Sequence, residues 1–458
     1  MLWRSILERF WLQRSSSVAL VVLCATGMVY YHLGIFIPRA LEIRAAQGRG
    51  NGYSFGADFY LLWLTTREGM LQHSDPYSPD TTHKIQIGVF GRPLDDHTPA
   101  TTPDPRAFAN PAFAELLFWP LALIPFPVVR IMLALILAAA TAISVALWLR
   151  VLGLHAGRAL RASLILLTLS SYAVLEGLFA GQIGLIAGCF LAASMAALVG
   201  QRLFLSGTLL ALALIKPQMM LLVAVYLLVW SLGRWRARWR FVAGFLLTSA
   251  LLVGSSLFVW PRWISEWFRV LLSYKQYAPP ALVSYIFGNS MGSYFGPILI
   301  VALLGGAFAL AWRMRSASSG STEFALTFSL LLAITAVTVL PGQAVYDHVI
   351  LLPGVILIAL SWRGFAASSR ILRIVLGVSA LALFWQWICA PVVIALQPIL
   401  SPRVFVSAVL TLPIRTAASI PFGVLAVLTL MMRQVTRGKT RAGEGAERTQ
   451  VDLRRINL

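Results

Sequence analysis

Twelve apolar stretches, each long enough to cross a lipid bilayer or to cross it with a break, constrain the fold of this chain more than any other feature. Because the bilayer core offers no water to pair with backbone groups, a spanning segment must be a helix or part of a closed barrel. Hydrophobic residues make up 59% of the 458 residues and charged residues only 12%, which excludes an ordinary soluble protein. We therefore predict an all-α polytopic membrane protein with about 12 transmembrane helices. The stretches lie at about 16–37, 127–149, 162–178, 182–200, 203–215, 218–232, 241–260, 294–312, 323–340, 347–362, 374–396 and 416–432.

The distribution of positive charge favours twelve crossings over eleven. The stretches 203–215 and 218–232 meet at Lys216-Pro217, so they are also consistent with one long helix kinked at the proline. With twelve crossings and both termini in the cytoplasm, about +18 of the formal net charge of +20 falls on cytoplasmic segments, as the positive-inside rule requires. Eleven crossings would place Arg433 and Arg437 outside. The charge therefore orients the protein in a membrane and gives little support to nucleic-acid binding.

The chain divides into one transmembrane domain, residues 1–432, and a basic cytoplasmic tail, residues 433–458. The tail has the polar, charged composition of a disordered segment. The longest loop, residues 38–126, is predicted to lie on the extracytoplasmic side, which also carries nearly every unusual polar residue.

Two apolar stretches inside the long outer loop have helical character. Residues 55–70 and 110–126 are expected to form interfacial or re-entrant helices, the second interrupted by prolines. The Pro-, Asp- and Thr-rich residues 74–106 between them predict an irregular segment.

Asp58 is the first candidate functional residue. It falls one turn into the first of these outer helices, between aromatic side chains of the kind that pack on sugar rings. A carboxylate in that position can act as a general base toward a hydroxyl. A single Asp near a helix start is also a common structural feature, because it interacts favourably with the helix dipole.

Lys216 is the second candidate, since it lies within an apolar stretch of about thirty residues. A cation at membrane depth is costly without a partner, and a phosphate is a natural one. The alternative is a lysine that reaches the membrane surface and only marks the end of a span.

Tyr346, Asp347 and His348 form a polar triplet at the mouth of the tenth apolar stretch. Together they are suited to binding a phosphate or a hydroxyl, although an Asp helix cap beside a boundary tyrosine explains them as well. Gln182, which follows Gly181 in a turn between spans, is a weaker candidate for hydrogen bonding to a sugar.

The sequence predicts no metal site and no bound cofactor. The histidines lack the spacings of metal-binding motifs, and no Walker A or Rossmann glycine pattern is present. Any donor substrate is therefore expected to come from the membrane or from the outer compartment.

In their order along the chain, six short motifs resemble those of glycosyltransferase family 87. This family comprises polyprenol-phosphate-mannose-dependent enzymes with the GT-C membrane fold, and it includes the phosphatidylinositol-mannoside mannosyltransferases. The motifs are Asp58-Phe59 with Trp63, Asp75-Pro76-Tyr77-Ser78-Pro79, Asn110-Pro111 running to Trp119-Pro120-Leu121-Ala122, Gly181-Gln182, Lys216-Pro217-Gln218, and Tyr346-Asp347-His348 with Leu352-Pro353.

The resemblance implies a GT-C-type glycosyltransferase that takes a sugar from a lipid phosphate in the outer leaflet. It implies that Asp58 is the general base and that Lys216, His348 and Tyr346 hold the donor phosphate. The further residues that it implies for substrate binding are Trp63, Tyr77, Asn110, Gln182, Gln218 and Asp347.

The expected function is thus transfer of a hexose, mannose by resemblance, from a polyprenyl-phosphate donor to a lipid or glycan acceptor. The expected location is the bacterial inner membrane, among membrane lipids, with the site on the extracytoplasmic face. A multi-span transporter or lipid flippase is the main alternative, because a broken span with a buried lysine also suits a carrier. A carrier, however, is expected to show two repeated halves with polar residues at mid-membrane.

Overall fold

The computed structural model describes residues 15–46, 54–94, 105–274, 276–288, 294–342, 344–368 and 370–456. Within these ranges every regular element is a helix, and the only strand-like feature is one isolated bridge between Ala281 and Pro341. The all-α prediction is therefore confirmed. Parts of the predicted outer loop, residues 47–53 and 95–104, lie outside the described residues.

Seven helical segments are long and apolar enough to cross a membrane, judged by length and composition within the described residues. Two shorter helices, α8 Arg158–Leu169 and α9 Tyr172–Ala180, meet at an angle of 60°. They make an eighth span if the pair counts as one broken crossing. The seven are Ser17–Ala46 (α2 Ser15–Tyr30, η1 Tyr31–Phe36 and α3 Ile37–Ala46), α7 Phe126–Val151, α13 Trp235–Val259, α16 Phe295–Arg313, Val345–Trp362 (η2 Val345–Leu351 and the start of α18 Leu352–Ser368), α19 Arg370–Leu396, and Pro402–Thr436 within α20 Pro402–Ile456.

The other four predicted spans coincide with shorter apolar helices. These are α10 Gly184–Val199, α11 Leu203–Ala213, α12 Pro217–Leu232 and α17 Thr322–Thr338. Crossing a bilayer perpendicularly takes about twenty helical residues, so their length alone does not identify them as spans. All twelve predicted stretches are thus helical, while the count of twelve crossings stays a prediction. α11 ends at Ala213 and α12 begins at Pro217, which has no backbone N–H with which to continue the hydrogen bonding of α11. The turn that contains Lys216 therefore separates the two helices, and they do not form one kinked helix.

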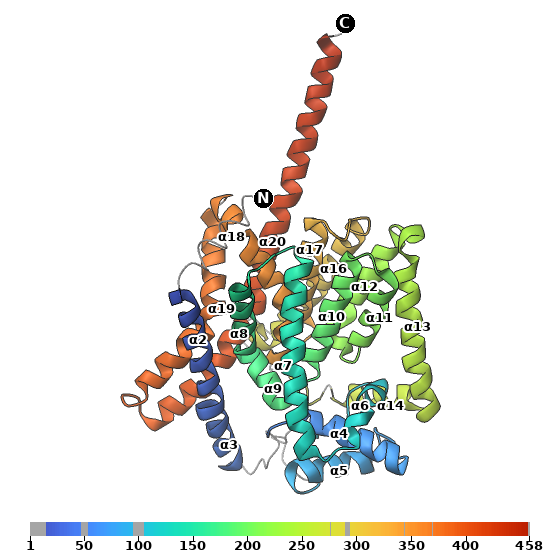
Figure 1. Cartoon of the computed structure of the whole chain (residues 1–458), viewed down its shortest axis with the longest axis vertical. Coiled ribbons are helices and arrows are strands. Elements are labelled where there is room, and N and C mark those ends of the chain that lie inside the picture. The colour runs from blue at the N-terminus through green and yellow to red at the C-terminus, as the bar shows by residue number, and fades with distance from the viewer. Residues whose placement is uncertain are drawn as a thin grey trace.

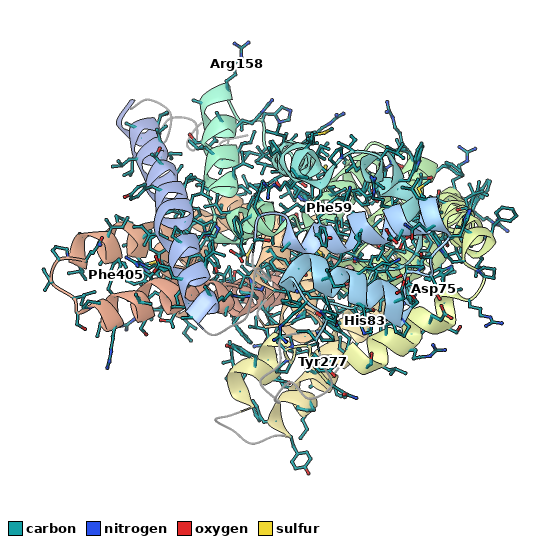
Figure 2. The ribbon with its side chains drawn as sticks, turned by 90° about the horizontal axis from the view of Figure 1, so that it is seen from below. Phe59, Asp75, His83, Arg158, Tyr277 and Phe405 are labelled. Carbon is teal, nitrogen blue, oxygen red and sulfur yellow. The ribbon has the colours of Figure 1, made fainter. Side chains whose placement is uncertain are left out.

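Four helices gather at one end of the molecule, opposite the end from which α20 projects (Figure 1). Viewed from that end, α4 and α5 lie side by side across the bundle, with Phe59 near its centre (Figure 2). The four are α4 Ala57–Gln72, α5 Pro79–Phe90, α6 Phe113–Ala122 and α14 Trp263–Tyr274, and a fifth short helix, α15 Leu282–Phe287, packs on α16 and α17. The first predicted outer helix, 55–70, corresponds to α4, and the second corresponds in part to α6.

The prediction that residues 74–106 form an irregular segment is wrong for α5. Ser78 caps this helix by accepting a hydrogen bond from the Thr81 backbone N–H at 3.1 Å, Pro79 occupies its first turn, and Gly91 ends it with φ of 77°. These are ordinary start and stop signals of a helix. The abundance of Pro, Asp and Thr in the segment concealed them.

The structure continues α20 as a helix to Ile456, through most of the tail for which the sequence predicts disorder (Figure 1). Adding one residue to an existing helix costs far less than starting a new helix. No proline follows Pro421 to stop it.

Glycines let α11 and α13 approach each other closely. A Cβ atom on Gly207 of α11 would lie 2.0 Å from the Phe241 carbonyl oxygen, and one on Gly244 of α13 would lie 2.1 Å from the Phe204 carbonyl oxygen. Small residues of this kind are typical of helix contacts in membranes. The packing fixes α11, and with it the turn that carries Lys216.

Candidate active site

Five polar side chains from distant parts of the sequence form one continuous chain of contacts. Arg106 Nη1 lies 2.6 Å from Asp58 Oδ1, and Gln182 Nε2 donates a short hydrogen bond to Asp58 Oδ2. Lys216 Nζ donates to Gln182 Oε1 at 2.7 Å and to Asp347 Oδ1 at 2.5 Å. The structure therefore brings Asp58, Gln182, Lys216 and Asp347, four residues that the sequence predicted separately, into a single site.

Two glycines hold Asp58 against Gln182. Gly56 precedes α4 with φ of 81°, and its N–H donates to the Phe179 carbonyl oxygen at 2.8 Å, which ties the start of α4 to the end of α9. Gly181 has φ of 76°, and a Cβ atom there would lie 3.0 Å from Phe59 Cβ. Only glycine adopts such a conformation at little cost, so Gly56 and Gly181 set the distance between the two side chains.

Lys216 and Asp347 form a buried ion pair, with side chains 7% and 2% exposed. The ammonium also lies 4.8 Å from the ring centroid of Tyr346, within cation–π range. A Cβ atom on Gly184 would lie 2.7 Å from Asp347 Oδ1 and 3.1 Å from Lys216 Nζ, so the first turn of α10 leaves room for this pair. Three helix ends therefore meet at the ion pair.

Arg106 was not identified from the sequence. It has φ of 58°, a left-handed conformation that is uncommon for a residue other than glycine and costs about 1–3 kcal/mol. Its backbone is held on both sides, because Gln86 Nε2 donates to the Pro105 carbonyl oxygen at 3.0 Å and Phe108 is fully buried. A cation in a polar outer loop is unremarkable in a sequence, and only the fold shows that its partner is Asp58.

His348 lies next to this chain of contacts in sequence but faces another way. Its ring is buried, and neither ring nitrogen has a hydrogen-bond partner within the described residues. It borders a largely apolar cavity of about 280 Å³ between α8, α9, α18, α19 and α20. The residues that line this cavity run from His348 on η2 to Trp362 on α18.

The remaining predicted site residues lie apart from these contacts. Trp63 Nε1 donates to the Ile124 carbonyl oxygen at 3.0 Å, and the Tyr77 hydroxyl donates to the Asn110 carbonyl oxygen at 2.8 Å. Trp63, Tyr77 and Asn110 therefore join α4 and the turn before α5 to the segments on either side of α6. Gln218 is exposed on the first turn of α12, and no hydrogen bond between it and the chain of contacts is found within the described residues.

Carboxyl groups also gather near the other end of α4. Glu115 is buried, and burial raises its pKa well above the usual range. The pKa of Glu266 is raised as well, chiefly by a hydrogen bond with Asp75 and to a smaller extent by burial. A carboxyl group kept from water in this way favours its neutral form, so Glu115 is a poor candidate for binding a cation.

The arrangement around Asp58 has the parts that acid–base chemistry on an anionic substrate requires. A carboxylate that accepts a proton lies one amide group away from a buried ammonium, which attracts negative charge. Arg106 adds a second cation on the other side of the carboxylate. The site combines a candidate base with two candidate anion ligands.

Comparison with known families matches residues 108–341, just over half of the chain, to glycosyltransferase family 87. The matched segment includes Gln182 and Lys216, while Asp58, Arg106 and Asp347 flank it on either side. No curated protein and no solved structure matches the chain at a significant level. Because the match extends over more than half of the sequence, the chain belongs to glycosyltransferase family 87 and is a glycosyltransferase.

Proposed function

We propose that this glycosyltransferase moves a hexose, mannose by family resemblance, from a polyprenyl-phosphate donor to a lipid or glycan acceptor. The observation that carries the proposal is the continuous contact from Asp58 through Gln182 to Lys216 and Asp347. It places a candidate base and a buried cation at the two ends of one amide side chain, the separation of roles that a displacement at a sugar carbon requires.

The proposed step is a displacement with inversion. The acceptor hydroxyl oxygen forms a bond to the anomeric carbon while the bond from that carbon to the phosphate oxygen breaks. Asp58 takes the hydroxyl proton, and polyprenyl phosphate leaves with the bonding electron pair. Lys216 and Tyr346 stabilise the charge that develops on the leaving phosphate.

The apolar cavity beside His348 supports a lipid-linked donor. Its walls are almost entirely apolar, and it runs along α18 away from the Asp58 site for most of the length of that helix. A long hydrocarbon chain suits such a cavity, because its apolar surface there contacts apolar side chains and not water. His348 borders this cavity, and the family resemblance supports a role for it in holding the donor phosphate where the lipid tail ends.

The proposed location is the bacterial inner membrane, with about twelve crossings of the GT-C type and both termini in the cytoplasm. The helices α4, α5, α6 and α14 then face the extracytoplasmic side, together with the site. The distribution of positive charge in the sequence supports this orientation.

The test is a transfer assay with purified protein. Radiolabelled polyprenyl-phosphate mannose is incubated with the protein and a total lipid extract, and new labelled lipids or glycans are separated and identified by mass spectrometry. The proposal expects label in a new product. If the label crosses the membrane of vesicles that contain the protein and no product forms, the protein acts as a carrier and the proposal fails.

A further inference from the structure

We propose that Arg106, which forms an ion pair with Asp58 in the structure, is a ligand of the donor phosphate. Binding of the donor then moves the guanidinium from Asp58 Oδ1 to the phosphate and frees the base for the acceptor hydroxyl. This inference rests on the proposed function, and it adds a residue and an order of events: donor before acceptor.

The contacts of Asp58 motivate the inference. Arg106 Nη1 donates to Asp58 Oδ1 at 2.6 Å and Gln182 Nε2 donates to Asp58 Oδ2, so both carboxylate oxygens accept a strong hydrogen bond. An acceptor hydroxyl that must give its proton to Asp58 competes with these donors. One of them has to leave or weaken before the base is fully available.

The environments of the two cations indicate which one moves. Lys216 is 7% exposed and is fixed by Asp347, Gln182 and the ring of Tyr346. Arg106 is 18% exposed, and its ion-pair partner Asp58 is 25% exposed. A partly exposed ion pair is more readily exchanged for a new partner than a buried one. Arg106 is therefore the cation that an incoming phosphate recruits.

The chemistry of the guanidinium fits this exchange. Its planar fork of N–H donors matches carboxylate and phosphate oxygens equally well, so it can leave one oxyanion for another. Among the described residues of this chain of contacts, the positive charges of Arg106 and Lys216 balance the negative charges of Asp58 and Asp347. An added phosphate makes the site anionic, and transfer of Arg106 to the phosphate places the cation where the leaving group gains charge.

The backbone at Arg106 supports a movement of the side chain alone. Pro105 is anchored through Gln86, and Phe108, two residues after Arg106, is fully buried, so the left-handed conformation at Arg106 is held from both sides. Such conformations persist where the surroundings impose them, and they are frequent at functional sites. The side chain is thus aimed at the site from a fixed point.

The experiment measures equilibrium binding of polyprenyl-phosphate mannose to full-length protein in detergent, without acceptor. Arg106→Gln should weaken binding by about tenfold to a hundredfold, the effect of losing a hydrogen bond to a charged group. Asp58→Asn should tighten binding by roughly threefold to tenfold, because Arg106 loses its ion pair with the Asp58 carboxylate. The double variant should bind no more tightly than Arg106→Gln alone.

Arg92→Gln, the same change in charge at an exposed position of the same loop, is the matched control and should leave binding unchanged. Arg106→Lys keeps the charge and should retain part of the affinity, which guards against a folding defect. The inference is overturned if Arg106→Gln binds like the wild type, or if Asp58→Asn tightens binding equally with and without Arg106. If the wild type itself does not bind the donor, the proposed function fails instead.

Discussion

Replacing either Lys216 or Asp347 by an apolar residue should destabilise the protein strongly, and the loss of unfolding free energy should differ between the two variants. Their nitrogen and oxygen lie 2.5 Å apart, and their side chains are 7% and 2% exposed, so water screens the pair little. Removing one partner of a buried ion pair typically costs about 3–5 kcal/mol, because it leaves an uncompensated charge. Asp347→Leu leaves the ammonium its contacts with Gln182 and Tyr346, which places the loss near about 3 kcal/mol.

Lys216→Met removes the only side-chain partner that Asp347 has within the described residues, so its loss should approach about 5 kcal/mol. The double variant replaces both charges by apolar groups and should lose less than either single variant. The coupling energy is the difference between the double loss and the sum of the single losses. We expect it to be at least about 5 kcal/mol, because the single losses sum to about 8 kcal/mol and the double variant should lose less than about 3 kcal/mol.

Denaturant unfolding in detergent, followed by tryptophan fluorescence, measures these free energies. Arg39→Met breaks an exposed ion pair, whose side chains are 41% and 60% exposed, and serves as the control with an expected loss below about 1 kcal/mol. Additive losses at Lys216 and Asp347 would show that the two charges do not interact in the folded protein.

Three further predictions concern α10, α6 and Asp58. Gly184→Ala should lower turnover by about a hundredfold, because the added Cβ would displace the Asp347 carboxylate. Gly188→Ala, one turn further along α10, should leave turnover unchanged, because the nearest atom to its Cβ, Val349 Cγ1, lies 3.4 Å away. Steady-state rates of the two variants test this prediction. Burial raises the pKa of Glu115, so the stability that its proton contributes is complete below about pH 4.3 and is lost as pH rises through the folded pKa. Glu115→Gln should therefore melt increasingly above the wild type as pH rises from about 4 to 8, and a constant difference in melting temperature would contradict this reasoning. Asp58→Asn should lose transfer and keep donor binding, as developed below.

Asp58, Lys216 and Asp347 were predictable because a charge in an apolar sequence is costly and therefore informative. Gln182 followed from its position beside a turn, and the structure places it at the centre, between Asp58 and Lys216. Arg106 was missed because a cation in a polar loop carries no such signal, and its partner lies 48 positions away in the chain.

His348 illustrates a limit of reasoning from neighbouring positions. The sequence groups it with Tyr346 and Asp347, but η2 is a 3₁₀ helix, in which successive side chains point about 120° apart. Asp347 therefore faces Lys216, while His348 faces the apolar cavity.

The helices themselves were largely predictable from hydrophobicity. The exception is α5, because Ser78 and Gly91, which mark its start and its end, were overlooked among other turn-forming residues.

The most direct test of the account compares wild-type protein with Asp58→Asn in one assay that measures both donor binding and sugar transfer. Loss of a general base lowers turnover by about 10²- to 10⁴-fold. The account predicts that Asp58→Asn binds polyprenyl-phosphate mannose at least as tightly as the wild type and forms product at least a hundredfold more slowly. Turnover within tenfold of the wild type would show that Asp58 is not the base.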